Sequence, residues 1–284
     1  MADQVKYLSK LRDKHVLVFG GSSGIGYAVA EAATEHGARV TISSSDPERV
    51  TRALDAITTA YPSRRDYVSG RPCDLGDEET MDENIRTLFE ELDPVDHVVF
   101  TGEFGLRKSA DGKGVVELSV SATAPVGEAV PPVPIANATV EDLRTAMGAR
   151  YIAPALIAKH AGRHLRPDPG TSITLSTGVV TERPIPGWSA VAGARSAIIG
   201  LGKNLALDLR PVRVNIVAVG AVDTGVSIHQ DADRRIDVQS ALESRTATGR
   251  VALAEDVAEA YLYCMKDMNV TGSVISTNGG VLLR

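Results

Sequence analysis

Short apolar runs alternate with helix-like runs along almost the whole chain. Runs typical of β-strands cover residues 15–19, 39–43, 68–74, 97–100, 172–176, 212–219 and 273–276. Runs typical of helices cover residues 27–36, 47–61, 77–92, 140–165, 189–209 and 254–265, and the long run 140–165 is expected to be interrupted near Pro154. This alternation predicts right-handed β-α-β crossovers and a single α/β domain over residues 1–284. We expect one doubly wound parallel sheet of about seven strands, with helices on both faces.

Residues 104–137 interrupt this rhythm. The segment is rich in Gly, Pro, Ser and Ala, and residues 131–134 contain three prolines. A loop of this length in a compact domain is usually functional or disordered. We expect either a flap near the site or a surface insertion, in which residues 115–120 have the composition of a short strand.

Composition narrows the class of protein. Hydrophobic residues make up 43% of the 284 residues and aromatic residues only 4%, which suits a parallel sheet buried on both faces. The net charge of −6 argues against nucleic-acid binding. Without a membrane-length apolar run or a signal-peptide pattern, we expect a cytoplasmic protein that does not enter membranes. Cys73 and Cys264 lie far apart and are expected to be buried free thiols, with no disulfide or metal site.

A glycine-rich loop separates the first predicted strand from the first predicted helix. Gly20 allows a sharp turn, while Gly24 and Gly26 let the backbone and the helix approach a pyrophosphate closely. The helix N-terminus then offers N–H groups and partial positive charge to the phosphates. The other residues of the loop expected at this site are Ser22, Ser23 and Ile25.

The residues at the end of the second predicted strand indicate whether the cofactor is NAD(H) or NADP(H). Ser43, Ser44 and Ser45 stand where an NAD-preferring site usually has a carboxylate for the ribose 2′-hydroxyl. Serines can donate to a 2′-phosphate, and Arg49 could reach it from the next helix. Asp46 would favour NAD(H) if it turned toward the ribose. We therefore expect NADP(H) in preference to NAD(H).

These segments and several downstream resemble the short-chain dehydrogenase/reductase family. The further matches are residues 73–75, 100–102, 213–220 and Thr224, with Phe19 and Val219 replacing the family Thr and Pro. The resemblance covers nearly the whole chain outside residues 104–137 and implies a Rossmann-type fold. It also implies further cofactor-binding residues, namely Asp74, Leu75, Thr101, Gly102, Arg195, Gly220, Val222 and Thr224.

The catalytic residues of the family are altered. Its Asn, Ser, Tyr and Lys fall on Arg150, Thr177, Val191 and Arg195, with Ser176 as the alternative to Thr177. In the family, the Tyr supplies a proton and the Lys lowers its pKa. Neither Val191 nor a guanidinium that stays protonated can replace that phenol. Proton donation to a ketone oxygen therefore lacks its usual donor.

Reduction of an iminium carbon avoids this difficulty. The substrate already carries positive charge, so hydride transfer neutralises it and needs no acid, and proximity to the hydride donor suffices. This favours a C=N bond over a C=O bond as the substrate. The rival hypotheses are an ordinary carbonyl reductase with an unusual proton donor and a non-catalytic protein that binds NADP(H).

The chain further resembles a divergent fungal subgroup of the family. The matching segments are residues 150–154, 172–175, 184–188 and 207–211. Some members lack the Tyr/Lys pair and act in prenylated indole alkaloid biosynthesis. The resemblance implies an NADPH-dependent iminium reductase of secondary metabolism that also guides a Pictet–Spengler or Diels–Alder cyclisation. Ile185 stands where the Diels–Alder members have an Asp.

Five side chains are candidates for contact with substrate, each with a structural alternative. Glu103 would pair with a cation or act as a base, or else be an exposed loop residue. Arg150 would serve the site or form a surface salt bridge, and Arg195 would bind the cofactor ribose or pack its stem. Trp188 would stack on an indole or cap the core. Thr177 would bond to substrate or only to the backbone.

The predicted helix over residues 189–209 is rich in Ala and Gly, and Asn278-Gly279-Gly280 follows the last predicted strand. Both features resemble subunit contacts of oligomeric family members, although a buried helix within one chain needs small residues too. We expect a homo-oligomer, either a dimer or a tetramer, acting on a small molecule.

Overall fold

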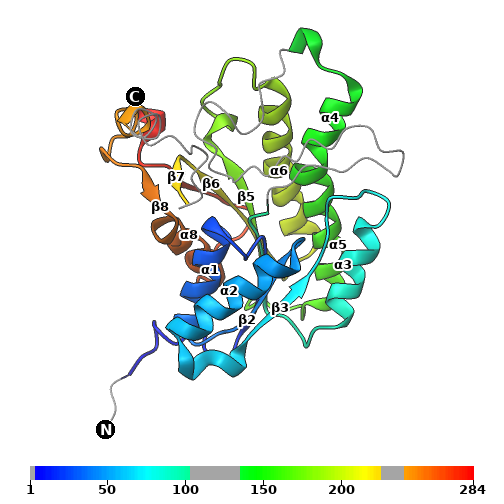
Figure 1. Ribbon diagram of the computed structural model, residues 1–284, viewed down its shortest axis with the longest axis vertical. Helices are drawn as coiled ribbons and strands as arrows, with labels where there is room; N and C mark the ends of the chain where they lie inside the picture. The colour runs from blue at the N-terminus through cyan, green and yellow to red at the C-terminus, as the bar shows by residue number, and fades with distance from the viewer. Residues whose placement is uncertain (1–3, 103–134, 225–239) are drawn as a thin grey trace.

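The computed structural model describes residues 4–102, 135–224 and 240–284 (Figure 1). Glu103, residues 115–120 and most of the segment 104–137 therefore lie outside the described residues. Seven strands form one sheet in the order β3-β2-β1-β4-β5-β6-β9. Their bounds are β1 His15–Phe19, β2 Arg39–Ser44, β3 Val68–Pro72, β4 His97–Phe100, β5 Ser172–Gly178, β6 Arg213–Val219 and β9 Val274–Thr277. All neighbouring pairs run parallel, which confirms the predicted doubly wound sheet.

Helices cover both faces of this sheet, as Figure 1 shows. One group is α1 Gly24–Glu35, α2 Pro47–Ala60 and α8 Ala254–Lys266, and the other is α3 Met81–Glu90, α5 Ala153–His164 and α6 Ser189–Asp208. Strand β1 shows how the sequence serves both layers, because successive side chains point to opposite faces. Val16 and Val18 pack into the core beneath α1 and α8, whereas Leu17 and Phe19 pack into the core beneath α3 and α5.

Several boundaries differ from the prediction. Helix α1 begins at Gly24, three residues before the predicted start at 27, because the glycine loop turns directly into the helix. The predicted helix 140–165, expected to be interrupted near Pro154, is divided just before that residue into α4 Val140–Met147, a π-helical turn Gly148–Ile152 and α5. The extra residue of a π-turn leaves room for Pro154, whose ring would clash with a carbonyl inside a regular helix. A small parallel sheet of β7 Val222–Asp223 and β8 Ala252–Leu253 was not predicted.

The remaining elements are short. Short 3-10 helices cover Pro62–Tyr67, Ile135–Asn137, Val179–Thr181 and Val281–Leu283. None of the helices in the described ranges has both the length and the apolar character that a membrane crossing requires. Those same ranges contain no group of three His, Cys, Asp or Glu side chains arranged to hold a metal ion.

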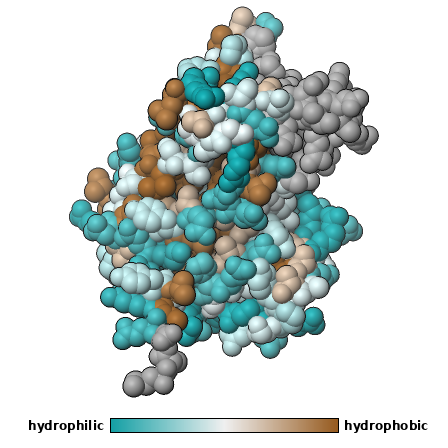
Figure 2. Space-filling model, turned by 90° about the vertical axis from the view of Figure 1, so that its left-hand side faces the viewer, coloured by the Kyte–Doolittle hydropathy of each residue, from teal (hydrophilic) through white to brown (hydrophobic). Residues whose placement is uncertain are grey.

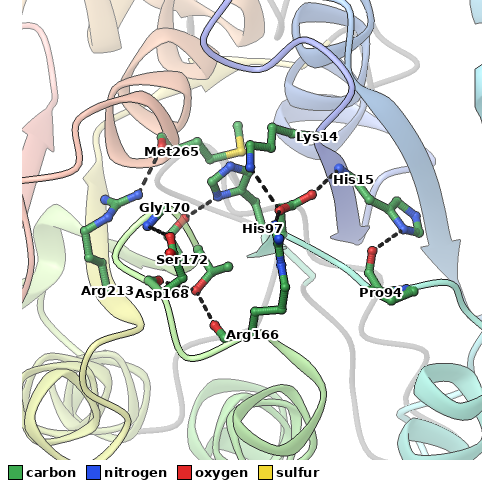
Figure 3. Close-up of polar contacts among 12 residues, drawn as sticks. Lys14, His15, Pro94, His97, Arg166, Asp168, Gly170, Ser172, Arg213 and Met265 are labelled. Atoms are coloured by element: carbon green, nitrogen blue, oxygen red, sulfur yellow. Dashed lines mark hydrogen bonds and ion pairs between the residues drawn. The ribbon is translucent and has the colours of Figure 1, made fainter.

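A polar network ties together the starting ends of the strands (Figure 3). Asp96 accepts from the His15 N–H at 2.9 Å and pairs with Lys14 at 3.2 Å and Arg166 at 2.6 Å. His97 is 1% exposed, and its Nδ1 lies 2.9 Å from Ser172 Oγ. Burial lowers the pKa of His97 to about 3, so this ring is neutral in the folded protein.

Arg213, at the start of β6, extends this network to α8. Its guanidinium donates to the carbonyl oxygens of Cys264 at 2.6 Å and Met265 at 3.0 Å. These carbonyls belong to the last turn of α8, where backbone oxygens have no partner within the helix. The N-terminal edge of the sheet is therefore an anchoring edge, and the opposite edge is left for the site.

Candidate active site

The glycine loop lies at the C-terminal edge of the sheet. Gly20 and Gly24 have φ angles of 80° and 53°, which favour glycine. The N–H of Gly20 donates to Ser43 O at 2.8 Å, and this bond fixes the turn. A Cβ on Gly26 would overlap the carbonyl oxygen of Gly20. Because only glycine fits at these positions, no side chain stands between the loop backbone and the space beyond it, as a pyrophosphate site requires.

The first turn of α1 is directed at the same space. Ser23 occupies the N-cap position, but its side chain makes no capping hydrogen bond, and the first turn contains no acidic residue. The N–H groups of this turn therefore remain available to an anion. Ser22 is half-buried and Ser23 is exposed, so both lie on the accessible side of the loop. Ile25 is 4% exposed and packs into the core beneath the loop.

The segments after β4 and β7 close around the loop. A Cβ on Gly20 would lie 2.7 Å from Gly102 Cα, and one on Gly24 would lie 3.0 Å from Thr224 Cγ2. Thr101 donates to Phe19 O from its N–H at 3.0 Å and from its hydroxyl at 3.1 Å. The structure thus brings together the predicted cofactor residues from three distant parts of the sequence.

Four further predicted cofactor residues line the neighbouring strand ends. Asp74 Oδ1 accepts from the Gly76 N–H at 2.9 Å, and Leu75 is 6% exposed. Gly220 follows the end of β6, and its N–H donates to Thr277 O at 3.0 Å. Val222 is 5% exposed and supports this wall from β7. All four lie along the C-terminal edge of the sheet, where nucleotides bind in such folds.

Asp46 lies just beyond the end of β2, at the start of α2. Its carboxylate accepts from the N–H groups of Glu48 at 2.9 Å and Arg49 at 3.2 Å, capping α2. The hydrogen bond from the Arg49 backbone is the main reason that the pKa of Asp46 is lowered. Because this carboxylate is committed to the helix, it does not point freely at a ribose.

The side chains beside Asp46 are hydrogen-bond donors and one is positively charged. The Arg49 guanidinium lies 3.2 Å from Asp46 and 3.4 Å from Ser45 Oγ. Ser44 and Ser45 are half-buried, while Ser43 is wholly buried and acts through its carbonyl oxygen beneath the glycine loop. Ser44, Ser45 and Arg49 thus form the group able to hold a 2′-phosphate, and Ser43 contributes through its backbone.

Arg195 crosses the end of β5 from α6. It is 6% exposed, and a Cβ built on Gly178 would lie 2.5 Å from its Nη1. Burial lowers the pKa of Arg195 to about 10, which still leaves the guanidinium charged at neutral pH. The hydroxyl of Thr177 is buried and donates to Arg195 O at 2.7 Å. Thr177 therefore takes the second of its two expected roles, a bond to the backbone.

Arg150 lies in the π-turn between α4 and α5 and is half-buried. Its pKa is lowered by burial first and by the positive charge of Arg195 second, so the two guanidinium groups are near neighbours. Arg150 and Arg195, which stand at the positions of the family Asn and Lys, are thus close together near the end of β5.

The start of α6 carries no phenol. Val191 is half-buried in its first turn, and Trp188 is half-buried at the N-cap position. Trp188 is bonded to the preceding turn through its backbone N–H, which donates to Ile185 O at 3.1 Å. Glu103, the predicted acidic member of the site, lies outside the described residues.

One polar pair behind the site was not predicted. Tyr261 on α8 is 0% exposed, and its hydroxyl lies 2.7 Å from Ser176 Oγ, which donates to Phe100 O at 2.5 Å. Burial raises the pKa of Tyr261. This phenol faces the interior and bonds to a strand residue, so it is not placed as a proton donor to substrate. From the sequence, Tyr261 is recognisable only as a residue of a helix that packs against the sheet, so its contact with Ser176 could not be predicted.

Comparison with known proteins identifies this architecture. The SDR-like Rossmann domain matches residues 7–120 and 108–284, so the chain belongs to the short-chain dehydrogenase/reductase family. It is similar to the short-chain dehydrogenase/reductase malC of Malbranchea aurantiaca, with 37% identity over 96% of this chain and 96% of that one. It is equally similar to fsr5 of Gibberella fujikuroi, with 37% identity over 100% of both chains.

Solved structures agree. The MalC reductase/Diels-Alderase from Malbranchea aurantiaca superposes with a TM-score of 0.84 at 37% identity, covering 98% of this chain and 100% of that one. A small-chain dehydrogenase in complex with NADPH has a TM-score of 0.70 at 24% identity, with 96% and 100% covered, and shows the shared fold. These similarities confirm the predicted family, its fungal subgroup and its reductase class.

Proposed function

We propose that this protein is an NADPH-dependent reductase of fungal secondary metabolism that acts on a cyclic imine or iminium. One observation carries the proposal: the glycine cradle is intact, whereas Val191 and Arg195 replace the phenol and amine that normally deliver a proton. The similarity to malC and fsr5 supports a role in a fungus, because both are fungal members of the same family.

The chemistry follows from what the remaining side chains can do. When bound, NADPH would supply a hydride to the carbon of a C=N⁺ bond, and the π electrons would become the lone pair on nitrogen, so the amine would form without proton uptake. An imine substrate would have to enter already protonated, as its iminium form. The chain itself holds the dinucleotide through the glycine loop and α1, and Val191 presents an apolar surface where an acid would otherwise stand. Trp188 is offered as a planar contact for an indole-bearing substrate.

Substrate charge needs compensation in such a site. Arg150 and Arg195 place positive charge near the end of β5, so a cationic substrate requires a carboxylate nearby. Glu103 directly follows the turn at Thr101 and Gly102 and is proposed for that role, either pairing with the cation or removing a proton during cyclisation. Because the similar MalC protein is both a reductase and a Diels-Alderase, a coupled cyclisation is part of the proposal.

The central test compares two kinds of substrate. Purified protein with NADPH should reduce a cyclic indole iminium and show little turnover of simple ketones. The Val191→Ala variant should keep iminium reduction within about threefold, because Val191 donates no proton. Rapid ketone reduction that survives this substitution would show that another group supplies the acid and would overturn the proposal.

A second test separates the cyclisation from the reduction. The Glu103→Gln variant keeps the size of the side chain and removes its charge. Coupled cyclisation should slow by about tenfold or more, with little change in NADPH affinity. Equal rates in the variant and the wild type would remove Glu103 from the mechanism.

We also propose that the protein forms a homo-oligomer. Among the described strands, β9 lies at one edge of the sheet, and its Val274 and Ile275 are only half-buried. Figure 2 views the left-hand side of Figure 1, and hydrophobic side chains gather over its upper part. An edge strand with partly exposed apolar side chains, on a molecule with apolar surface, favours pairing with a second copy. Light scattering should give a dimer or tetramer, and the mass of one chain at micromolar concentration would contradict this.

A further inference from the structure

Gly178 stands out among the glycines near the site. It is the last residue of β5 and has an ordinary extended backbone, with φ −132° and ψ 160°, so no turn requires glycine there. What it provides is space, because a Cβ at this position would lie 2.5 Å from Arg195 Nη1 and 3.4 Å from Arg195 Cζ. Contacts under about 3 Å are far inside the van der Waals range for carbon and nitrogen.

The backbone that carries this guanidinium is held in place on two sides. Arg195 is 6% exposed, and its backbone oxygen accepts from the buried Thr177 hydroxyl at 2.7 Å. The next turn of α6 packs into the core through Ile198, which is 1% exposed. With α6 fixed at this point, the guanidinium cannot move aside by shifting the helix. Any side chain at position 178 must therefore displace the guanidinium itself.

We propose that Gly178 is a positioning residue, whose missing side chain creates the slot that seats the Arg195 guanidinium across the end of β5 at the reaction site. The inference rests on the proposed function for its effect on turnover, but the slot itself is a packing relation that can be measured separately. Position 178 thereby controls a cation that the sequence places in the site, although Gly178 itself carries no functional group.

The first experiment measures packing by a double-mutant cycle. Gly178→Ala should lower the melting temperature of otherwise unaltered protein by about 2–4 °C or more, since the new methyl group collides with the guanidinium. In the Arg195→Ala background the same substitution should shift it by less than about 1 °C. Gly193→Ala is the control on the same helix as Arg195, because a Cβ there meets nothing within 4 Å.

The second experiment repeats the cycle with turnover at saturating NADPH. Gly178→Ala should reduce kcat by about tenfold or more in the Arg195 protein and by less than about twofold in the Arg195→Ala background. Gly193→Ala should leave kcat unchanged. If Gly178→Ala fails to fold while the double variant folds, the result supports the packing part of the proposal, namely that Arg195 fills the slot.

Equal losses of melting temperature in both backgrounds would overturn the inference, because the methyl group would then be clashing with something other than Arg195. Coupling in melting temperature without coupling in kcat would also overturn it, because the slot would then be purely structural. If no C=N substrate is turned over by any variant, the proposed function fails, while the melting-temperature cycle still decides whether Arg195 occupies the slot.

Discussion

The stability of this protein should fall steeply in mild acid because of His97. This side chain starts β4, is 1% exposed, and contacts Ser172 at 2.9 Å. Its pKa is about 3 in the folded protein, lowered by burial, against about 6.5 for an unperturbed histidine. Between these two values the unfolded chain binds a proton that the folded chain excludes. The unfolding free energy therefore rises with pH across this window and is lost as pH falls through it.

The size of the effect follows from the two pKa values. Linkage gives a loss of about 2 kcal/mol between pH 7 and pH 5 from His97 alone. Urea unfolding at pH 5, 6 and 7 measures the slope, for the wild type and for His97→Asn and His97→Phe. Both variants should lose about 2 kcal/mol less than the wild type over this range, even if their stability at pH 7 differs.

The comparison between variants isolates one side chain. Burial alone would raise the pKa of the neighbouring Asp96, but its bonds to the His15 N–H, Arg166 and Lys14 outweigh burial and lower that pKa. Asp96 is present in all three proteins, so its contribution cancels in the difference. If wild type and variants show the same slope from pH 7 to pH 5, His97 is protonated in the folded state and the reasoning is refuted.

Three further predictions concern the cofactor site and the unexpected phenol. Arg49→Ala should weaken NADPH binding by about 10- to 100-fold and leave NADH binding nearly unchanged, because a charge-assisted bond to the 2′-phosphate is lost. Calorimetric titration measures the affinity for each cofactor, and an equal loss for both would contradict the prediction. Gly26→Val should abolish NADPH binding, since its side chain must displace the carbonyl of Gly20, and retained fluorescence enhancement of NADPH would refute the predicted cradle. Tyr261→Phe should lower the unfolding free energy by about 1 kcal/mol through loss of its hydrogen bond to Ser176, and iminium turnover should be unchanged. A large loss of turnover in a folded variant would show that the phenol takes part in the reaction.

The sequence was most informative where a single physical requirement decides the structure. Alternation of Val16, Leu17, Val18 and Phe19 between two cores needs only the pleat of a buried strand, so the sheet was predictable. The glycine loop was predictable for a similar reason, because its φ angles exclude other residues. These features are local, and periodicity and residue type suffice to find them.

Contacts between distant segments were not predictable in the same way. Nothing in the sequence around Gly178 indicates that the guanidinium of Arg195, on the following helix, fills the space above it. The pairing of Tyr261 with Ser176 likewise depends on how α8 packs over β5. The role of Asp46 is a further case: the predicted helix start at residue 47 is correct, but the direction of the short loop before it decides whether the carboxylate caps α2 or turns toward a ribose.

The two ends of the sheet divide their tasks, and protein engineers can use that division. Asp96, His97 and Arg213 fasten the starting ends of the strands, whereas Arg150 and Trp188 lie in the turns beyond the opposite ends. Libraries that randomise the latter positions leave the fastening network untouched, so substrate scope can be explored without eroding the scaffold that carries it.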